Sequence, residues 1–318
     1  MTLAIHSLAI SARLVINLHS LNNEGTEGNQ VQTRQVTIVD QDGELKAVNA
    51  ISGDMFKHIM VEHFQALARE QGQDRIPLCA GCQTFDADRI NKDKLFMDDL
   101  KEKQTEAIEQ IISHCALDDV AGILVTAGNR SLARKSVAEF GWVIGIPEKT
   151  RTDTFFHVRY DPSERGAGSG DEANTGQAIF HRPASSGVYA LVLNLDLFRV
   201  GRNDISLKYV LDKESRAIRI KTLLESVVST FIKPTGAMRN TQNPHIINLE
   251  GVICYSTKTV PAPMVSGLTD NYLAEIEGIA RALNILHPGA IEVLRFNGHA
   301  DFAEKMANLI NEVEPWGA

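Results

Sequence analysis

The stretch Leu8-Ala-Ile-Ser-Ala-Arg-Leu-Val-Ile-Asn-Leu-His19 decides the fold, because apolar side chains occupy every second position along it. Strict alternation of this length predicts a half-buried β-strand. One face is aliphatic, whereas the other offers hydroxyl, guanidinium, amide and imidazole groups from Ser11, Arg13, Asn17 and His19. No carboxylate lies among them, so this face is suited to phosphates, sugars and bases. An edge strand with a solvated face has the same pattern. The polar loop that follows adds a further amide, Asn22.

Composition excludes several classes of protein. The chain has 318 residues, 43% hydrophobic and 23% charged, as in folded globular proteins. It contains no apolar run long enough to span a membrane and no secretory signal pattern. Four cysteines are too few for a disulfide scaffold, so we expect a cytoplasmic protein. The net charge of −8 argues against indiscriminate nucleic-acid binding but allows a local basic groove.

Charge is distributed unevenly along the chain. Between Arg199 and Asn243 there are nine basic and four acidic residues, whereas from Met264 onward there are three basic and eight acidic residues. A basic middle and an acidic end would let copies of the chain stack head to tail.

A helix is predicted from Ser52 to about Gln71, with Ser52 as its N-cap and an apolar stripe along one side. Backbone N–H groups at Ser52 and Gly53 would bind an anion, and Lys57 and His58 follow one turn later. An ordinary cap followed by solvated side chains is the alternative.

A second candidate is the loop Lys233–Asn243, which follows a strongly amphipathic helix predicted over Glu214–Ile232. The loop contains two cations, a glycine and several side-chain hydrogen-bonding groups but no acid, which suits a phosphodiester backbone. Its candidate contacts are Lys233, Gly236, Met238, Arg239 and Asn240. Without a ligand the same loop would only end the helix.

A third candidate is a cationic cluster at a predicted junction between a loop and a helix, formed by Arg130, Arg134 and Lys135. Solvated surface is the alternative.

The fourth is Cys79-Ala-Gly-Cys82, a CxxC pattern found in zinc sites and redox pairs. A zinc site needs further ligands, and no second CxxC is present. The pair His114-Cys115 could reach it in space, so structural zinc, redox chemistry and ordinary thiols all stay open.

Two catalytic motifs are absent from the sequence: the Gly-x-Ser-x-Gly elbow and His-Glu-x-x-His. The acids Asp153, Asp161 and Asp171 would cleave RNA with a metal only if they converged. The order of strands and helices predicts a ferredoxin-like α+β core with large insertions, and such sheets often bind single-stranded RNA.

Four segments in the same order resemble the backbone subunit of type I CRISPR surveillance complexes (Cascade), in particular the DevR branch. They are Ser11–Asn22, Ala50–His58, Ser185–Tyr189 and Pro234–Asn240. The resemblance implies an RRM-like (ferredoxin-like) palm in residues 1–73 and 188–318, the latter with C-terminal helices. It also implies a helical fingers insertion with the return to the palm in 74–149, and an extended thumb in 150–187.

The resemblance further implies a non-catalytic subunit for antiviral defence, which polymerises along a CRISPR guide RNA and presents it to a target DNA strand. Its partners would be the guide, the target, further copies of itself and other Cascade subunits. It implies RNA contacts by the palm, first-helix and second-loop residues named above, and a base-splaying wedge in the thumb at Ile179, Phe180 and His181. The alternatives are a metal-dependent RNA endonuclease subunit of a related complex and a zinc-stabilised interaction protein.

Overall fold

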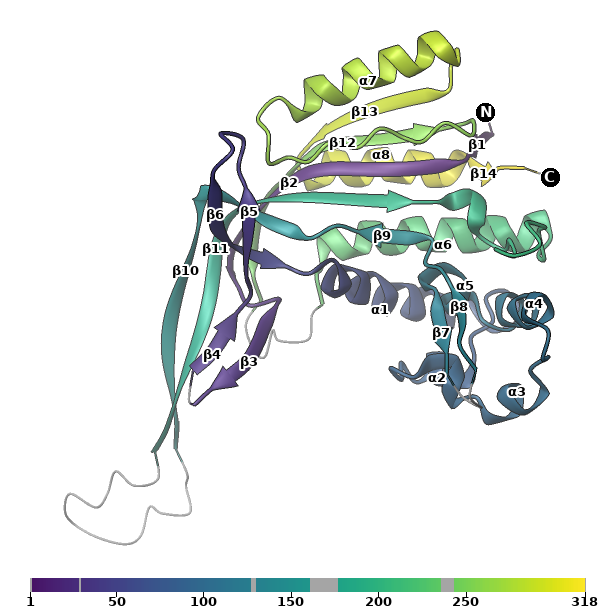
Figure 1. Cartoon of the computed structure of the whole chain (residues 1–318), viewed down its shortest axis with the longest axis horizontal. Coiled ribbons are helices and arrows are strands. Elements are labelled where there is room, and N and C mark those ends of the chain that lie inside the picture. The colour runs from purple at the N-terminus through teal and green to yellow at the C-terminus, as the bar shows by residue number, and fades with distance from the viewer. Residues whose placement is uncertain (1, 29, 127–129, 161–176, 236–242, 318) are drawn as a thin grey trace, which may run out of the picture.

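The structure is a computed structural model, and it describes residues 2–28, 30–126, 130–160, 177–235 and 243–317. It is a mixed α/β protein in which a large sheet carries helices on both faces (Figure 1). A helical lobe and a long two-stranded ribbon project from one side of this sheet (Figure 1). Among the described residues, no helix is long and apolar enough to cross a membrane.

The main path of the sheet has the order β13-β12-β2-β11-β10-β6-β5. The bounds of these strands are β2 (Ser7–His19), β5 (Gln35–Val39), β6 (Leu45–Ile51), β10 (Val143–Tyr160), β11 (Gln177–Leu195), β12 (His245–Ser256) and β13 (Ile291–Asn297). The strand predicted from the alternating pattern is therefore confirmed as β2, one residue longer than expected. It lies inside the sheet between β11 and β12, and it is antiparallel to both.

The aliphatic face of β2 forms the core together with three helices, α1 (Gly53–Gln71), α6 (Lys213–Ile232) and α8 (His299–Glu312). Their aromatic rings meet under the sheet: the ring centroid of Phe231 lies 6.2 Å from that of Phe56 and 5.5 Å from that of Phe302. The predicted start of α1 is confirmed, since the side chain of Ser52 accepts from Met55 N. The opposite face is covered by α7 (Tyr272–Leu286), which packs with Ala9 of β2 (Figure 1).

Four strands of this sheet are neighbours in space, and two helices connect them along the chain. The short strand β9 (Ala138–Phe140) pairs antiparallel with β11, which gives the neighbours β12-β2-β11-β9. Along the chain, α1 lies between β2 and β9, and α6 lies between β11 and β12. Both helices pack on the same face, against the core described above.

The helical lobe is the chain between α1 and β9, residues 72–137. It contains α2 (Ala80–Gln83), η1 (Arg89–Lys92), α3 (Lys94–Asp99), α4 (Gln104–His114), α5 (Ala116–Ala121), β7 (Ile123–Val125) and β8 (Leu132–Arg134). The prediction of a helix at Arg134 and Lys135 was wrong, because Leu132–Arg134 pairs as a strand with β7.

The ribbon is the outer part of β10 and β11, residues 150–160 and 177–187, which pair from Thr150↔Gly187 to Tyr160↔Gln177. It extends away from the sheet, and the hairpin β3 (Asn23–Glu27) and β4 (Gln30–Thr33) lies alongside it, with Gln30 of β4 paired to His181 (Figure 1). The remaining elements are β1 (Leu3–Ile5), η5 (Leu197–Arg199) and β14 (Val313–Pro315), and β1 pairs with β14.

Candidate nucleic-acid interface

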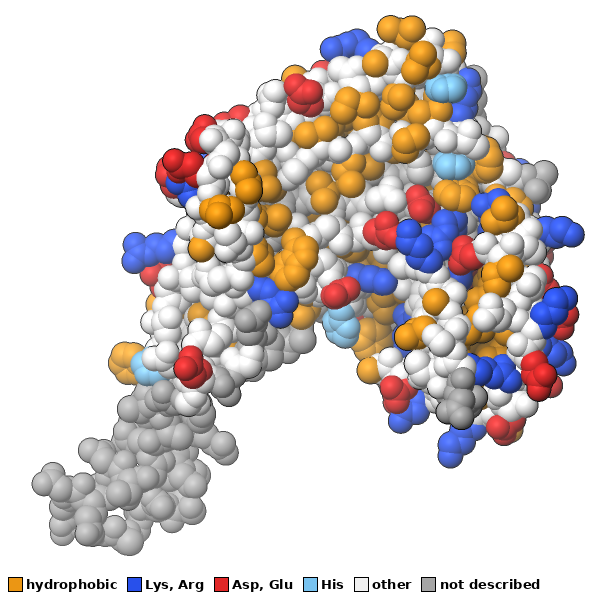
Figure 2. Space-filling view, viewed as in Figure 1, with side chains coloured by type: hydrophobic (Ala, Val, Ile, Leu, Met, Phe, Trp, Pro, Cys, Tyr) orange, Lys and Arg blue, Asp and Glu red, His pale blue; other side chains and the backbone are white. Residues whose placement is uncertain are grey.

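The end of β2, the start of α1 and the end of α6 come together at the side from which the ribbon and the helical lobe project. The side chain of Asn22, just after β2, accepts from Ser52 N at 2.7 Å. The ring of His63 on α1 lies with Nε2 2.9 Å from the carbonyl oxygen of Lys233, the residue after α6. Figure 2 shows a broad hollow here, between the ribbon and the helical lobe. We call this hollow the concave face.

Lys57 and His58 are the first-helix candidates that keep access to solvent. Both line a pocket of about 750 Å³ between α1 and the helical lobe, with Phe85 and Arg89 across from them. Burial lowers the pKa of the Lys57 amine, and the nearby Arg89 guanidinium adds to this shift. No carboxylate among the described residues forms an ion pair with Lys57. This amine is therefore a cation that an incoming phosphate would stabilise.

The backbone amides at the start of α1 are less available than predicted. Ser52 N donates to Asn22, and Met55 N donates to the Ser52 side chain. Gly53 is buried, and a Cβ at this position would overlap the carbonyl oxygen of Phe140. Ser52 and Gly53 thus position the helix, and the prediction of an open anion site formed by their N–H groups was wrong.

The polar face of β2 is mostly covered. Ser11 is 1% exposed, so the prediction that it lines an open surface was wrong. Arg13 donates to the carbonyl oxygens of Gly267 and Thr269 and forms an ion pair of 2.7 Å with Asp270. The segment before α7 thus provides the hydrogen-bond and ion-pair partners of the Arg13 guanidinium group. Arg13 and these partners are far apart in the sequence. The neighbouring Arg13 guanidinium lowers the pKa of the Asp270 carboxyl.

His19 does not share a face with Asn17, which is half-buried. Leu18 has a φ of 52°, and this left-handed residue breaks the strand alternation just before His19. His19 is 3% exposed, and its Nε2 lies 2.8 Å from Tyr189 Oη, which donates to Asn49. Burial lowers the pKa of His19 to about 3, so the ring is neutral. The ring is therefore enclosed by the protein, and its contact with RNA stays a prediction.

The predicted cationic cluster is divided among three environments. Arg130 donates to the carbonyl oxygens of Leu100 and Lys101. Arg134 is 2% exposed and is paired with the buried carboxylate of Asp119 and the partly exposed carboxylate of Asp204, so it does not belong to an accessible cationic cluster. Lys135 is exposed and forms an ion pair of 2.9 Å with Glu139.

Lys233 is exposed at the end of α6. The other candidates of this loop, Gly236, Met238, Arg239 and Asn240, lie outside the described residues, as do Asp161 and Asp171. Asp153 is exposed and is paired with Arg151 at 2.9 Å.

The candidate wedge residues fall in β11. The side chains of Ile179 and Phe180 lie outside the described part, whereas His181 is half-buried and pairs with Phe156 of β10. The centroids of these two rings are 6.3 Å apart, and Phe156 is 68% exposed. The sequence analysis missed Phe156, although two consecutive phenylalanines in a polar strand were a visible sign of it.

Of the nine basic residues between Arg199 and Asn243, three in the described part of the chain are buried, namely Arg199, Arg216 and Arg219, and Arg134 is buried with them. Asp119 of α5 binds Arg134 at 2.7 Å and Arg219 of α6 at 2.9 Å. Arg134 and Arg199 both bind Asp204, and the two guanidinium groups lower the pKa of its carboxyl. No local pattern in the sequence distinguishes these arginines from surface cations.

Cys79 and Cys82 are buried in the helical lobe, and Cys115 lies beside them. His114, which the sequence analysis placed with Cys115, instead binds Asp93 at 2.9 Å and stacks on Phe96.

Comparisons with known proteins agree with the resemblance noted from the sequence. The profile of the family described as "CRISPR-associated negative auto-regulator DevR/Csa2" matches residues 10–277. The CRISPR-associated protein Cas7/Cst2/DevR of Methanocaldococcus jannaschii is 27% identical over 95% of this chain and 96% of its own length. The CRISPR-associated protein Cas7/Csa2 1 of Saccharolobus solfataricus is 24% identical over 88% of this chain and 90% of its own length.

Among solved structures, a chain of a CRISPR RNA-guided surveillance complex in a pre-nicking state matches with a TM-score of 0.48 and 13% identity. That match covers 89% of this chain and 90% of the other. The family assignment depends on the profile match, which spans most of the sequence, and it confirms the resemblance inferred from the four segments. The chain belongs to the CRISPR-associated DevR/Csa2 family.

Proposed function

We propose that this chain is a Cas7-type, non-catalytic subunit of an RNA-guided surveillance complex, and that it binds the guide RNA along its concave face. The observation that carries the proposal is the family match over residues 10–277, together with relatives named Cas7 that align over nearly their full length. In this role several copies assemble head to tail along the guide, with other Cascade subunits at the ends, for antiviral defence.

The arrangement of the sheet supports an RRM-like palm. The order β12-β2-β11-β9, with α1 and α6 in the two crossovers on one face, is the order of a ferredoxin-like βαββαβ unit. In this proposal residues 1–73 and 188–318 form the palm, residues 74–149 hold the fingers and the return to the palm, and residues 150–187 form the thumb. The helical lobe and the ribbon are the fingers and thumb.

A guide of arbitrary sequence requires contacts to phosphate and sugar rather than to base edges. Lys57, Lys233 and His58 suit this requirement, since they are accessible and flank the concave face from α1 and α6. The net charge of −8 is compatible with it, because only the surface in contact with RNA has to be basic. Base pairing with the guide would then select the target DNA strand.

The ribbon supports a thumb that separates bases. Phe156 exposes most of its ring beside His181, and aromatic side chains on a protruding element stack on or between bases. Because the ribbon extends beyond the palm, it would reach RNA held by a neighbouring copy.

The first test is to purify the full chain without nuclease and to sequence any RNA that copurifies. Uniform RNA with CRISPR repeat sequence supports the proposal. Binding of a guide-length RNA is then measured by fluorescence anisotropy at several salt concentrations, because phosphate contacts make affinity fall with salt.

Lys57→Glu and Lys233→Glu are expected to weaken RNA binding at least tenfold each. Arg281→Glu is the matched control, because Arg281 is exposed on α7, which covers the opposite face of the sheet. Unchanged affinity in both variants would refute the proposed path of the RNA.

The non-catalytic assignment is tested separately. A paired target RNA is incubated with the guide-bound protein and magnesium or manganese. Cleavage at regular intervals would show an endonuclease subunit, whereas an intact target supports the proposed role.

A further inference from the structure

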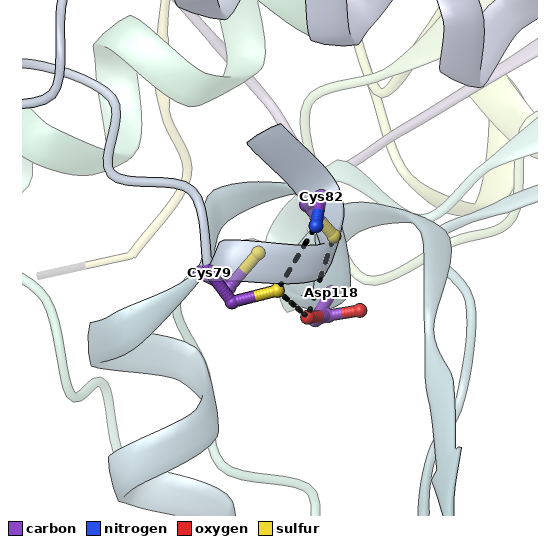
Figure 3. A group of neighbouring side chains, drawn as sticks. Cys79, Cys82 and Asp118 are labelled. Atoms are coloured by element: carbon purple, nitrogen blue, oxygen red, sulfur yellow. Dashed lines mark hydrogen bonds between the residues drawn. The ribbon is translucent and has the colours of Figure 1, made fainter. Parts of the chain in front are cut away.

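Three cysteines and one aspartate, distant in sequence, surround a single point inside the helical lobe. Cys79 is the N-cap of α2 and Cys82 lies on α2, whereas Cys115 joins α4 to α5 and Asp118 lies in the first turn of α5. Their ligand atoms all lie within 4.8 Å of one another, and all four side chains are 0% exposed. Cys79 Sγ lies 3.4 Å and Cys82 Sγ 3.7 Å from Asp118 Oδ2 (Figure 3).

We propose that Cys79, Cys82, Cys115 and Asp118 bind one structural zinc ion. Zinc prefers four ligands in a tetrahedron, with Zn–S bonds of about 2.3 Å, which separates the sulfur atoms by about 3.8 Å. Since the ligand atoms lie within 4.8 Å of one another, no pair of sulfur atoms has to approach by more than about 1 Å to reach this geometry. Thiolate ligands select zinc over magnesium and calcium, which prefer oxygen.

The surroundings of the four ligands favour a metal over four ordinary core side chains. A carboxylate with no solvent exposure is costly unless it is paired and well hydrogen-bonded. Here Oδ2 of Asp118 faces thiols, which are weak donors. Its other oxygen, Oδ1, lies 3.1 Å from Arg89 Nε but has no aligned hydrogen bond among the described residues. A cation between the sulfur atoms and Oδ2 would compensate this carboxylate directly.

The groups that contact the four candidate ligands are also those expected around a metal site. The backbone N–H of Cys82 points to Cys79 Sγ at 3.4 Å, an interaction that stabilises a thiolate within a CxxC turn. Arg89 beside Oδ1 would orient the ligating carboxylate, as second-shell groups commonly do. With zinc bound and the thiols ionised, the ion offsets two of the four ligand charges and Arg89 offsets a third.

The position of the site indicates what the ion would stabilise. Between Gly72 and Leu100 the chain has only short elements, α2, η1 and α3, with few buried apolar side chains. A zinc ion would join this segment to α4 and α5. The next residue, Asp119, is bound to Arg219 of the core helix α6, so the ion would lie close to the attachment of the helical lobe to the sheet.

The zinc site is also adjacent to the concave face. Cys82 and Arg89 line the same pocket as Lys57 and His58. Loss of the ion would therefore disturb the helical-lobe side of this pocket. The zinc proposal nevertheless rests on the four ligands alone and does not depend on RNA binding.

The test begins with the unaltered full chain, expressed with added zinc and purified without chelators. Metal analysis is expected to give one zinc per chain. Exchange with cobalt is expected to give the visible bands of a tetrahedral ion and a thiolate charge-transfer absorption with the intensity of three thiolates. A metal content far below one per chain, without such a spectrum, would overturn the proposal.

Variants then identify the ligands. Cys82→Ala is expected to lower the charge-transfer intensity by a third or to abolish metal binding. Cys254→Ala is the matched control, because Cys254 is equally buried but lies in β12 among residues that pack on α7. Asp118→Asn is expected to weaken cobalt binding at least tenfold while the three thiolates remain. An effect of Cys254→Ala equal to that of Cys82→Ala would contradict the site.

Mass spectrometry of the unaltered chain provides a measurement that does not depend on the folding of a variant. Under denaturing conditions without reductant, the proposal requires four free thiols that become alkylated. A disulfide between Cys79 and Cys82 in the freshly purified chain would overturn it.

Discussion

Arg134 Nη2 lies 2.7 Å from Asp119 Oδ1, and both side chains are completely excluded from solvent. Asp119 belongs to α5 of the helical lobe and also binds Arg219 of α6, so one carboxylate joins two cations from different parts of the fold. The pair with Arg134 joins α5 to β8 within the lobe, and the pair with Arg219 fastens the lobe to the core helix α6.

Arg134→Ala is expected to destabilise the fold by about 3–5 kcal/mol, because it removes one of the two guanidinium groups that compensate the buried carboxylate of Asp119. The measurement is urea unfolding followed by circular dichroism at neutral pH. Lys135→Ala is the neighbouring control: its side chain is 67% exposed, and its pair with Glu139 is worth about 0–1 kcal/mol at most. Equal losses in the two variants would show that the pair with Asp119 is not structural.

Neutral His19 makes stability depend on pH. Its pKa of about 3 in the folded chain is below the ordinary value of 6.5, so the unfolded chain binds the proton more readily. The contribution of His19 is therefore complete above pH 6.5 and is lost as pH falls from 6.5 toward 3. Between pH 7 and pH 5 we expect a loss of about 2 kcal/mol from this group.

His19→Gln removes this titration, so its unfolding free energy should fall less than that of the unaltered chain between pH 7 and pH 5. The exposed His287 provides the control. The change in unfolding free energy between pH 7 and pH 5 should be the same in His287→Gln as in the unaltered chain. A pH dependence in His19→Gln identical to that of the parent would contradict the neutral, buried ring.

Gly53→Ala is expected to cost about 1–3 kcal/mol, because the new methyl group would overlap the carbonyl oxygen of Phe140 and push α1 away from β9. Gly278→Ala is the matched control in α7, where the nearest atom to a Cβ is 3.9 Å away. There the helix propensity of alanine should raise stability by up to about 1 kcal/mol. Thermal and urea unfolding of both variants would test whether Gly53→Ala lowers the free energy of unfolding and Gly278→Ala raises it.

Phe156→Ala is expected to leave folding stability within about 0.5 kcal/mol, since the ring is 68% exposed. Under the proposed function, it should weaken binding of single-stranded RNA by about 1–3 kcal/mol, the value of one stacked base. A guide containing 2-aminopurine would report base separation through its fluorescence. Val39→Ala, an exposed apolar change on β5, should alter neither quantity, and identical behaviour of the two variants would exclude the role of Phe156.

The elements that follow a simple period could be predicted from the sequence. The alternation in β2 predicted a strand correctly, and the apolar rows of α1 and α6 predicted helices correctly. Each period reflects apolar side chains that lie on one face of the element and pack against the core. The N-cap at Ser52 was predictable for the same local reason. The strand at Leu132–Arg134 was not, since three residues are too short for a period to appear.

The accessibility of the candidate site residues could not be predicted from the sequence. Residue type suggested RNA contacts for Arg13, His19 and Arg134, yet each has a partner within the protein. Asp270 is 257 positions from Arg13, and Asp119 is separated from Arg219 by the whole ribbon. Partners this far apart cannot be identified from the residues near each of them in the sequence.

By itself, the sequence determined the β2 strand, the principal helices and the family, because these depend on periodic burial and on ordered motifs along the chain. Only the tertiary structure decided which polar groups remain available and which four side chains converge in the helical lobe. Periodicity reports which face of an element is buried. What covers the other face, and which distant charge neutralises a given side chain, is decided when the elements pack together.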